Sequence, residues 1–530
     1  MSLLAINNLS LDIGQTSILH DVSLSISKGK IFGLAGQSGA GKSMTALSIM
    51  GLLPEAAQVR GTITLYGNDL LSRTERQMCA VRGRHVGMVF QEPMSALNPL
   101  HTIGAQVAET VRVHERVSRA EAYARAANML DRVGLPPVRI PMDRFPHELS
   151  GGQRQRVVIA MAMVLSPKLI IADEPTTALD VMAQAQILDL LRRLVDEDGV
   201  SLMLITHDLA VMAKMADNLA IMRRGKIIEC GPTPALLRDL SHEYSKTLLK
   251  STAFRPLRAP HDIEKDKPIL EARHIVCRYE KSGFRAVDDV SLIIKKGENV
   301  GLVGESGCGK STLLRALLAL CAPQEGEVLL RGDAFKPGAN AKSKAQRKDI
   351  QMVFQDPYGS FNPRHKVSRL VAEPFHLEEK KRTDAEYRAA VVEMLQRVGL
   401  SAVDADKYPH QFSGGQRQRI AIARALITRP SLVALDEAVS ALDVTARARI
   451  LALLADLSDD LGVSFLFVSH DLGVVRAICD RVLVMRGGKI VEDGPVEEVF
   501  AQPRHPYTKA LIAATPDLET ALAARESRSA

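Results

Sequence analysis

Short apolar runs alternate along the chain with longer segments of helical periodicity. Residues 169–172 and 202–205 are continuously apolar, which predicts strands that are buried on both faces. Between residues 93 and 149 the pattern becomes helical and charged, for example over residues 119–133. This order predicts an α/β fold in which helices cover a mostly parallel sheet, with a helical insertion.

The same pattern of motifs occurs twice along the chain. Paired lysines lie 268 residues apart, paired glutamines 264 apart, and paired serines, aspartates and histidines each 263 apart. The pairs are Lys42 and Lys310, Gln91 and Gln355, Ser150 and Ser413, Asp173 and Asp436, and His207 and His470. A nearly constant offset indicates an internal duplication. We therefore predict two homologous domains, residues 1–250 and 268–515, with a linker at 251–267 and a helical or frayed C-terminal tail at 516–530.

Bulk composition agrees with a globular protein of several domains. The 530 residues are 46% hydrophobic and 24% charged, and the net charge of +7 comes from interspersed acidic and basic residues, so it says little about partners. No apolar run approaches eighteen residues and no signal-like leader opens the chain, which predicts a cytosolic location. The six cysteines form no Cys-x-x-Cys pair, which argues against zinc or iron–sulfur sites.

A glycine-rich turn follows the apolar run at residues 31–35. Residues 36–43 read Gly-Gln-Ser-Gly-Ala-Gly-Lys-Ser and precede a helix-like run. In such a turn, backbone N–H groups and the helix N-terminus surround phosphates, while the lysine reaches the β and γ phosphates and the serine can bind Mg²⁺. A chance glycine turn is the alternative, but the pattern recurs at residues 304–311. The predicted nucleotide-binding residues are Gly36, Gln37, Ser38, Gly39, Ala40, Gly41, Lys42, Ser43 and Met44, and Gly304, Glu305, Ser306, Gly307, Cys308, Gly309, Lys310, Ser311 and Thr312.

A carboxylate pair follows a later apolar strand in each copy. It is Asp173-Glu174 in the first and Asp436-Glu437 in the second. Beside a phosphate loop, the aspartate suits Mg²⁺ and the glutamate can polarise the attacking water. Glutamines that close other strands, Gln91 and Gln355, can touch both the metal and the water. The predicted metal ligands are Ser43, Gln91, Asp173, Ser311, Gln355 and Asp436.

Two further features complete each copy. Ser150, Gly151, Gly152 and Gln153, mirrored by Ser413, Gly414, Gly415 and Gln416, open helix-like runs and offer a hydroxyl and N–H groups to an anion. An ordinary serine N-cap is the alternative, which the twofold recurrence makes insufficient. His207 and His470 follow apolar strands, where they can hold the catalytic geometry; a structural role is the alternative for either. The predicted catalytic residues are Glu174, Glu437, His207, His470, Gln91 and Gln355.

With these motifs in this order, both copies resemble the nucleotide-binding domain of ATP-binding cassette (ABC) proteins over nearly their full length. The resemblance implies two P-loop ATPase domains in tandem, each with a mostly parallel sheet, antiparallel strands and a helical insertion. It implies ATP and Mg²⁺ as ligands. It also implies head-to-tail association, so that Ser413 and Gly415 complete the first ATP site, and Ser150 and Gly152 the second.

Further segments resemble the oligopeptide, dipeptide and nickel importer branch of that family. They lie at residues 91–99, 355–363 and 505–511, the last reading His-Pro-Tyr-Thr-Lys-Ala-Leu. The resemblance implies a fused energy-coupling subunit for peptides or peptide-like solutes, working with two transmembrane permeases and a substrate-binding protein. It implies a peripheral place on the cytoplasmic face of the bacterial inner membrane. No cysteine follows Cys479, so we expect no iron–sulfur cluster, and we expect no nucleic-acid partner.

The two copies differ at two positions. Tyr279 is the expected adenine-stacking aromatic of the second copy, but its first-copy counterpart is Ile13, which predicts weaker ATP binding there. Cys308 lies inside the second phosphate loop where the first has Ala40. One hypothesis is an acidified thiol close to the phosphates; the other is a small residue tolerated in a tight turn.

Other classes of tandem cassette protein fit less well. A ribosome-acting translation factor would resemble its relatives in a long charged linker and an Asn-His-Leu-Asp turn, whereas the turns at residues 177–180 and 440–443 read Thr-Ala-Leu-Asp and Ser-Ala-Leu-Asp. A DNA-repair cassette protein would need zinc cysteines and large insertions. The translation factor is retained as the alternative function.

Overall fold

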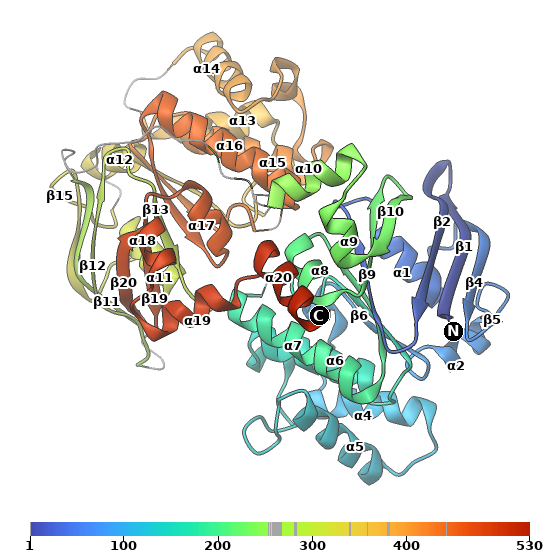
Figure 1. The fold of residues 1–530 in the computed structure, drawn as a ribbon. Helices are drawn as coiled ribbons and strands as arrows, with labels where there is room; N and C mark the ends of the chain where they lie inside the picture. Colours follow the sequence, from blue (N-terminus) through green and yellow to red (C-terminus); the bar gives the residue numbers. More distant parts are fainter. Residues whose placement is uncertain are drawn as a thin grey trace. The chain divides into compact units, whose positions relative to one another are not determined.

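A computed structural model describes most of the chain. It covers residues 2–177, 179–252, 254, 256, 268–279, 283–338, 341–357, 359–378, 382–440 and 442–529. Most of the expected linker at 251–267 lies outside the described residues, as do residues 178, 358 and 441 of the segments quoted above. The chain divides into two compact units, Met1–Thr252 together with Pro516–Ala530, and Ala253–Thr515. Each unit is described by itself (Figure 1).

The first unit contains a six-stranded sheet of order β10-β9-β3-β8-β7-β6. Every neighbouring pair in it is parallel except β10 and β9. A second, antiparallel sheet has the order β2-β1-β4-β5. The strands are β1 (Ser2–Ile13), β2 (Thr16–Ser27), β3 (Ile31–Ala35), β4 (Ala57–Leu65), β5 (Asn68–Asp69), β6 (Val86–Val89), β7 (Leu169–Asp173), β8 (Ser201–Thr206), β9 (Asn218–Arg223) and β10 (Lys226–Pro232). The mostly parallel sheet with antiparallel strands is therefore confirmed.

Helices cover this sheet and form the insertion. They are α1 (Lys42–Met50), α2 (Glu75–Val81), α3 (Pro93–Ala96), α4 (Ile103–His114), α5 (Arg119–Arg132), η1 (Pro146–Glu148), α6 (Gly151–Met163), α7 (Val181–Asp198), α8 (Leu209–Met215), α9 (Thr233–Arg238) and α10 (Glu243–Thr252). The charged segment at 119–133 forms α5, whose N-cap Ser118 accepts a hydrogen bond from the Glu121 N–H at 3.1 Å.

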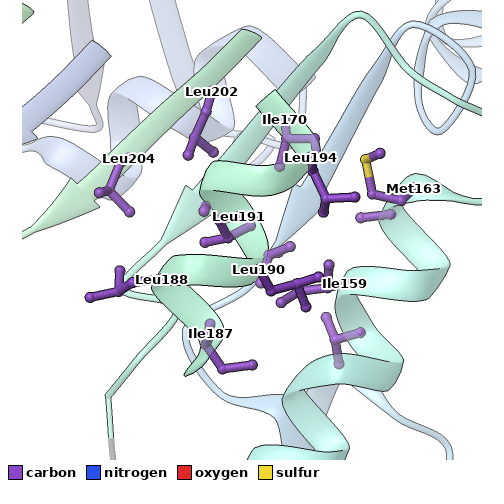
Figure 2. Packing of buried hydrophobic residues seen from close by; sticks show 14 of the residues in the cluster. Ile159, Met163, Ile170, Ile187, Leu188, Leu190, Leu191, Leu194, Leu202 and Leu204 are labelled. Carbon is purple, nitrogen blue, oxygen red and sulfur yellow. The ribbon is translucent and has the colours of Figure 1, made fainter. Parts of the chain in front are cut away.

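The buried strands β7 and β8 pack against α7 and α6. Figure 2 shows the leucines and isoleucine of α7 between Ile170, Leu202 and Leu204 of the strands and Ile159 and Met163 of α6. Leu188, Leu190 and Leu191 of α7 are each 1% exposed. Burial of this apolar surface stabilises the sheet whose ends carry the motif residues.

The second unit repeats the topology. Its sheets have the orders β20-β19-β13-β18-β17-β16 and β12-β11-β14-β15. The strands are β11 (Pro268–Arg278), β12 (Arg285–Lys295), β13 (Val300–Val303), β14 (Glu325–Leu330), β15 (Asp333–Ala334), β16 (Ile350–Val353), β17 (Leu432–Asp436), β18 (Ser464–Ser469), β19 (Arg481–Arg486) and β20 (Lys489–Pro495). The helices are α11 (Lys310–Leu317), α12 (Ala341–Asp349), α13 (Val367–Ala372), η3 (Glu373–Leu377), α14 (Asp384–Arg397), η4 (Ala402–Asp406), η5 (Pro409–Gln411), α15 (Gly414–Leu426), α16 (Val444–Leu461), α17 (Leu472–Ile478), α18 (Val496–Ala501) and α19 (Pro506–Ala514).

The C-terminal tail, expected to be helical or frayed, is the helix α20 (Leu518–Ser529) and belongs to the first unit. It contacts α8. Leu518, Ala521 and Leu522 pack against the apolar cluster of that unit. The guanidinium of Arg525 donates hydrogen bonds to the carbonyls of Ala216 and Lys214. The C-terminal helix therefore packs on the core of the first unit, although the second unit lies between the two in the sequence.

Candidate active site

The first phosphate loop, residues 36–41, joins the carboxyl end of β3 to α1. Gly41 has φ +104° at the N-cap of α1, and a Cβ there would lie 2.7 Å from the Leu19 side chain. No other residue type fits this position without displacing its neighbours. The Lys42 ammonium, 5% exposed, donates to the carbonyls of Gly36 at 2.8 Å and Gln37 at 2.9 Å. The lysine thus lies across its own loop, beside the N–H groups that bind phosphate.

The second phosphate loop, residues 304–309, has the same geometry between β13 and α11. Gly309 has φ +112° and also caps its helix. The Lys310 ammonium donates to the carbonyls of Gly304 at 2.7 Å and Glu305 at 2.9 Å. The phosphate loops of the two copies therefore have matched geometry.

Glu174 contacts two other predicted site residues, Gln91 and His207, and also Thr177. It follows the end of β7 and has φ +46°, a conformation that non-glycine residues rarely adopt and that is found at functional sites. Gln91 Nε2 and the Thr177 hydroxyl donate to its Oε2 at 3.2 and 3.0 Å. His207 Nδ1 lies 3.2 Å from its Oε1. Strands β6, β7 and β8 are neighbours, so their carboxyl ends bring these side chains together.

The second copy repeats the cluster around Glu437, which also has φ +46°. Gln355 Nε2 donates to Oε2 of Glu437 at 2.8 Å, and His470 Nδ1 lies 3.2 Å from Oε1. Glutamates and histidines 263 positions apart, and glutamines 264 apart, thus occupy equivalent positions.

The charge state of Glu174 suits a base. Burial acts to raise the pKa of its carboxyl, but the His207 hydrogen bond and charge, the Lys42 charge and the Thr177 hydrogen bond together hold that pKa below its ordinary value. The carboxyl is therefore ionised at neutral pH and can accept a proton.

Asp173 differs from its neighbour. Burial, with the charge of Glu174, raises the pKa of Asp173, against hydrogen bonding from Ser43 and the charge of Lys42. Its Oδ1 is buried and has no hydrogen-bond partner among the residues that the structure describes. A buried carboxylate oxygen without a partner, beside a serine hydroxyl, is a donor set that fits Mg²⁺. Burial likewise raises the pKa of Asp436 in the second copy.

Replacing Asp173 by Asn should stabilise the nucleotide-free protein. The raised pKa means that the folded state disfavours the ionised carboxylate. This group therefore lowers the free energy of unfolding as the pH rises above the pKa that Asp173 has in the unfolded chain. Removing the charge should raise Tm at pH 7 by about 2 °C, which corresponds to roughly 1 kcal/mol in the free energy of unfolding. Thermal melting without nucleotide or Mg²⁺ measures this.

The matched control is Asp189→Asn, which removes the same charge from an exposed position on α7. Its Tm should not change. A lower Tm for the Asp173 variant would mean that the carboxylate stabilises the protein without metal. That result would contradict a buried metal ligand whose charge is unpaired until Mg²⁺ binds.

The segments at residues 150–153 and 413–416 begin α6 and α15. Ser150 Oγ accepts from the Gln153 N–H at 3.4 Å, while Gln153 Oε1 accepts from the Ser150 N–H at 3.0 Å. Ser413 and Gln416 form the same reciprocal pair. The serine therefore is an N-cap, and its exposed position leaves the hydroxyl and the helix N-terminus accessible to an anion as well.

The two copies differ where the adenine was expected to stack. Tyr279 is 52% exposed, and its hydroxyl lies 3.1 Å from Thr312 Oγ1 on the helix that follows the phosphate loop. Ile13 ends β1 and packs partly buried against the apolar cluster of the first unit. Met44 stands where the second copy has Thr312. The first copy thus presents no aromatic face at this position.

The hypothesis of an acidified thiol at Cys308 is wrong for the protein without nucleotide. Burial raises the pKa of this thiol more than the charge of Lys310 lowers it, and the residue is 5% exposed. Cys308 packs in the turn as a small residue.

Two residues of the site were missed. The hydroxyls of Tyr244 and Tyr507 accept hydrogen bonds from the N–H groups of Gln37 and Glu305. Each of these donors is the second residue of its phosphate loop. The two tyrosines are 263 residues apart and each follows a histidine by two positions. That shared offset was the signal that could have revealed them.

Comparisons with known proteins identify the family of the chain. The ABC transporter family model matches residues 19–177 and 287–440. The model for the C-terminal region of oligopeptide and dipeptide transporters matches residues 228–286 and 491–529. Among the described residues, no helix is both long and apolar enough to cross a bilayer.

Similar proteins match over nearly the whole chain. The peptidoglycan transport ATP-binding protein YejF of Agrobacterium fabrum is 44% identical over 98% of this chain and 97% of its own. The glutathione import ATP-binding protein GsiA of Salmonella choleraesuis is 42% identical over 95% of this chain and 87% of its own. A solved dimeric ATP-binding cassette with ADP and phosphate is 30% identical, covering 43% of this chain and 98% of that one, with a TM-score of 0.40. Because both family models and the two full-length relatives match, the chain belongs to the ABC transporter family of ATPases, as a tandem member that carries the oligopeptide/dipeptide C-terminal region in both copies.

Proposed function

We propose that the chain is the ATP-hydrolysing, energy-coupling subunit of a membrane ABC importer for peptides or peptide-like solutes. The observation that carries this proposal is the match, over nearly its full length, to ATP-binding proteins named for peptidoglycan transport and glutathione import. Both named solutes contain peptide bonds. The oligopeptide/dipeptide C-terminal region in each copy agrees with that class of solute.

Each copy holds ATP through its phosphate loop. The loop N–H groups and Lys42 or Lys310 bind the phosphates, and the charge of the buried lysine offsets that of the β and γ phosphates. Ser43, Asp173 and Gln91, with Ser311, Asp436 and Gln355, would hold Mg²⁺, which neutralises phosphate charge when bound. The family resemblance implies that the signature segments also act on ATP, and we propose that Ser413 and Gly415 would offer N–H groups and a hydroxyl to the first ATP, and Ser150 and Gly152 to the second.

Glu174 and Glu437 are the general bases. Each carboxylate takes a proton from the water whose oxygen attacks the γ-phosphorus, and the bond to the β–γ bridging oxygen breaks to leave ADP and phosphate. Gln91 and His207 contact opposite oxygens of Glu174 and so fix the direction of its lone pairs. Gln355 and His470 do the same for Glu437.

Each unit also presents a matched apolar pair beside its glutamine, which fits a permease partner. Leu52 and Phe90 are 41% and 40% exposed in the first unit, and Leu320 and Phe354 are 57% and 45% exposed in the second. In the second unit, Leu320 and Phe354 line a groove between the core and the helical insertion, together with Pro374 and Leu377. We assign this groove of the second unit, and the exposed Phe90 of the first, to cytoplasmic segments of two transmembrane permeases. Phe354 and Phe90 directly precede Gln355 and Gln91, so a shift of either glutamine at the ATP would reach them.

This assignment places the chain on the cytoplasmic face of the bacterial inner membrane, held there by its permeases, with a substrate-binding protein on the other side. The alternative, a ribosome-associated translation factor, is disfavoured because the relatives that span the chain are import and transport proteins.

The proposal is tested by purifying the full chain carrying Glu174→Gln and Glu437→Gln in the presence of ATP. These changes should slow hydrolysis and hold the ATP-bound state, so that partners of that state remain attached. Mass spectrometry of the purified material should identify two membrane proteins with several spanning segments. Phe90→Ser and Phe354→Ser, added together, should lower their recovery.

A chain with Glu197→Gln and Glu498→Gln is the matched control, since both glutamates are exposed. It should retain permeases less well because it still hydrolyses ATP. Recovery of ribosomes without membrane proteins would overturn the importer and favour the translation factor.

A further inference from the structure

A tyrosine from the segment after β10 or β20 touches each phosphate loop. The Tyr244 hydroxyl accepts a hydrogen bond from the Gln37 N–H at 3.0 Å. The Tyr507 hydroxyl accepts one from the Glu305 N–H at 2.9 Å. These contacts join residues that are more than two hundred positions apart in the sequence, and they recur in both copies.

The loop residue that donates to each tyrosine also accepts a hydrogen bond from the phosphate-loop lysine. Gln37 donates through its N–H to Tyr244, and its carbonyl accepts from the Lys42 ammonium at 2.9 Å. Glu305 does the same between Tyr507 and Lys310. Fixing the N–H of this residue therefore restrains the carbonyl that directs the lysine, and with it the charge that meets the phosphates.

Each tyrosine is itself firmly placed. Tyr244 is 8% exposed and Tyr507 6%. The guanidinium of Arg223 lies 4.9 Å from the centroid of the Tyr244 ring, and that of Arg486 lies 4.9 Å from the Tyr507 ring. Both arginines end the strand that neighbours the phosphate-loop strand.

The turn before each tyrosine is anchored in the same way. Glu229 accepts from the Ser241 and His242 N–H groups at 2.7 and 3.1 Å, and His242 Nδ1 accepts from the Tyr244 N–H at 3.0 Å. In the second copy the equivalents are Glu492, which accepts from Arg504 and His505, and His505, which accepts from Tyr507. A chain of hydrogen bonds thus runs from β10 or β20 to the phosphate loop.

We infer that Tyr244 and Tyr507 are positioning residues that set the affinity of each site for nucleotide. The inference rests on the proposed ATPase function and extends it to the oligopeptide/dipeptide C-terminal region, which contains both tyrosines. A buried tyrosine hydroxyl needs a partner for its own sake. Here the partner is the loop residue whose other end directs the catalytic lysine, so the contact acts on the loop.

The test is the full chain with Tyr244→Phe and Tyr507→Phe. Phenylalanine keeps the ring, its packing and its contact with the arginine, and removes only the hydroxyl. We expect KM for ATP and Kd for ADP to rise about three- to tenfold, the effect of losing one hydrogen bond, with kcat changed by less than about twofold. Thermal melting without nucleotide should be nearly unchanged.

The control carries Tyr123→Phe and Tyr387→Phe. These half-buried tyrosines lie on α5 and α14, and aromatic or cationic groups contact their rings as well. Their loss should leave KM and Kd as in the unmodified chain.

Unchanged KM and Kd in the Tyr244 and Tyr507 variant would overturn the inference. So would a fall in Tm with normal nucleotide affinity in the folded fraction, since that is the result of a purely structural role. If the unmodified chain bound neither ATP nor ADP, the proposed function itself would fail, which is a separate outcome.

Discussion

The double variant Glu174→Gln, Glu437→Gln should hydrolyse ATP roughly 10²- to 10⁴-fold more slowly than the unmodified chain, the range attributed to a positioned general base. Glutamine is nearly the same shape as glutamate and can still accept hydrogen bonds at its amide oxygen, so the cluster with Gln91 and His207 should persist. It cannot accept the proton of the attacking water. Steady-state phosphate release measures the rate, and ADP titration should give an unchanged Kd.

The single variants separate the two sites. Each should slow hydrolysis at its own site by the same factor and leave about half of the total rate if the sites act independently. A single variant that loses much more than half of the rate would show that one site depends on the other. The exposed Glu197→Gln, Glu498→Gln pair should hydrolyse at the normal rate. Full activity in the double variant would remove both glutamates from the role of base.

The unmodified chain should bind ATP with two affinities that differ by about 5- to 150-fold, with the second site the tighter. The physical reason is base stacking, worth roughly 1 to 3 kcal/mol per aromatic side chain. Tyr279 offers an exposed ring in the second copy, whereas Ile13 lies partly buried in the first. Tyr279→Ile should merge the two phases of a calorimetric titration at the weaker value.

Two further variants make that result specific. Ile13→Tyr should move the weak phase toward the tight one. Tyr279→Phe keeps the ring and removes only the hydroxyl that lies near Thr312, so it should keep both phases. A single affinity in the unmodified chain, insensitive to all three changes, would show that adenine stacking at this position is not what distinguishes the sites.

Much of the fold and the site follows from local sequence. The phosphate loops are predicted because strand, glycine turn and helix lie within about twenty consecutive residues, and the glycines at 41 and 309 are required by their left-handed backbone. The place of Gln91, Glu174 and His207 at the ends of apolar runs is also predicted, but their meeting follows from the order of strands β6, β7 and β8, which the structure supplies.

Other features depend on tertiary structure. The contact of Tyr244 with Gln37 joins two segments 207 residues apart, and no local pattern encodes it. Phe90 is exposed although an apolar side chain is by itself predicted to be buried. Apolar side chains do stay exposed on a surface that a partner covers, and the sequence alone does not reveal such a surface. The thiol of Cys308 looked reactive from its place in the loop, but burial, which spacing does not report, raises its pKa.

The packing of α20 on α8 separates the order of synthesis from the order of folding. A ribosome adds roughly 5 to 20 residues per second, so about fifteen to sixty seconds pass between residue 252 and the end of α20. During that interval the surface that receives Leu518 and Leu522 has no partner from its own chain, and a nascent chain stalled anywhere before residue 518 displays it. The first unit is therefore the first to be made and among the last to be finished.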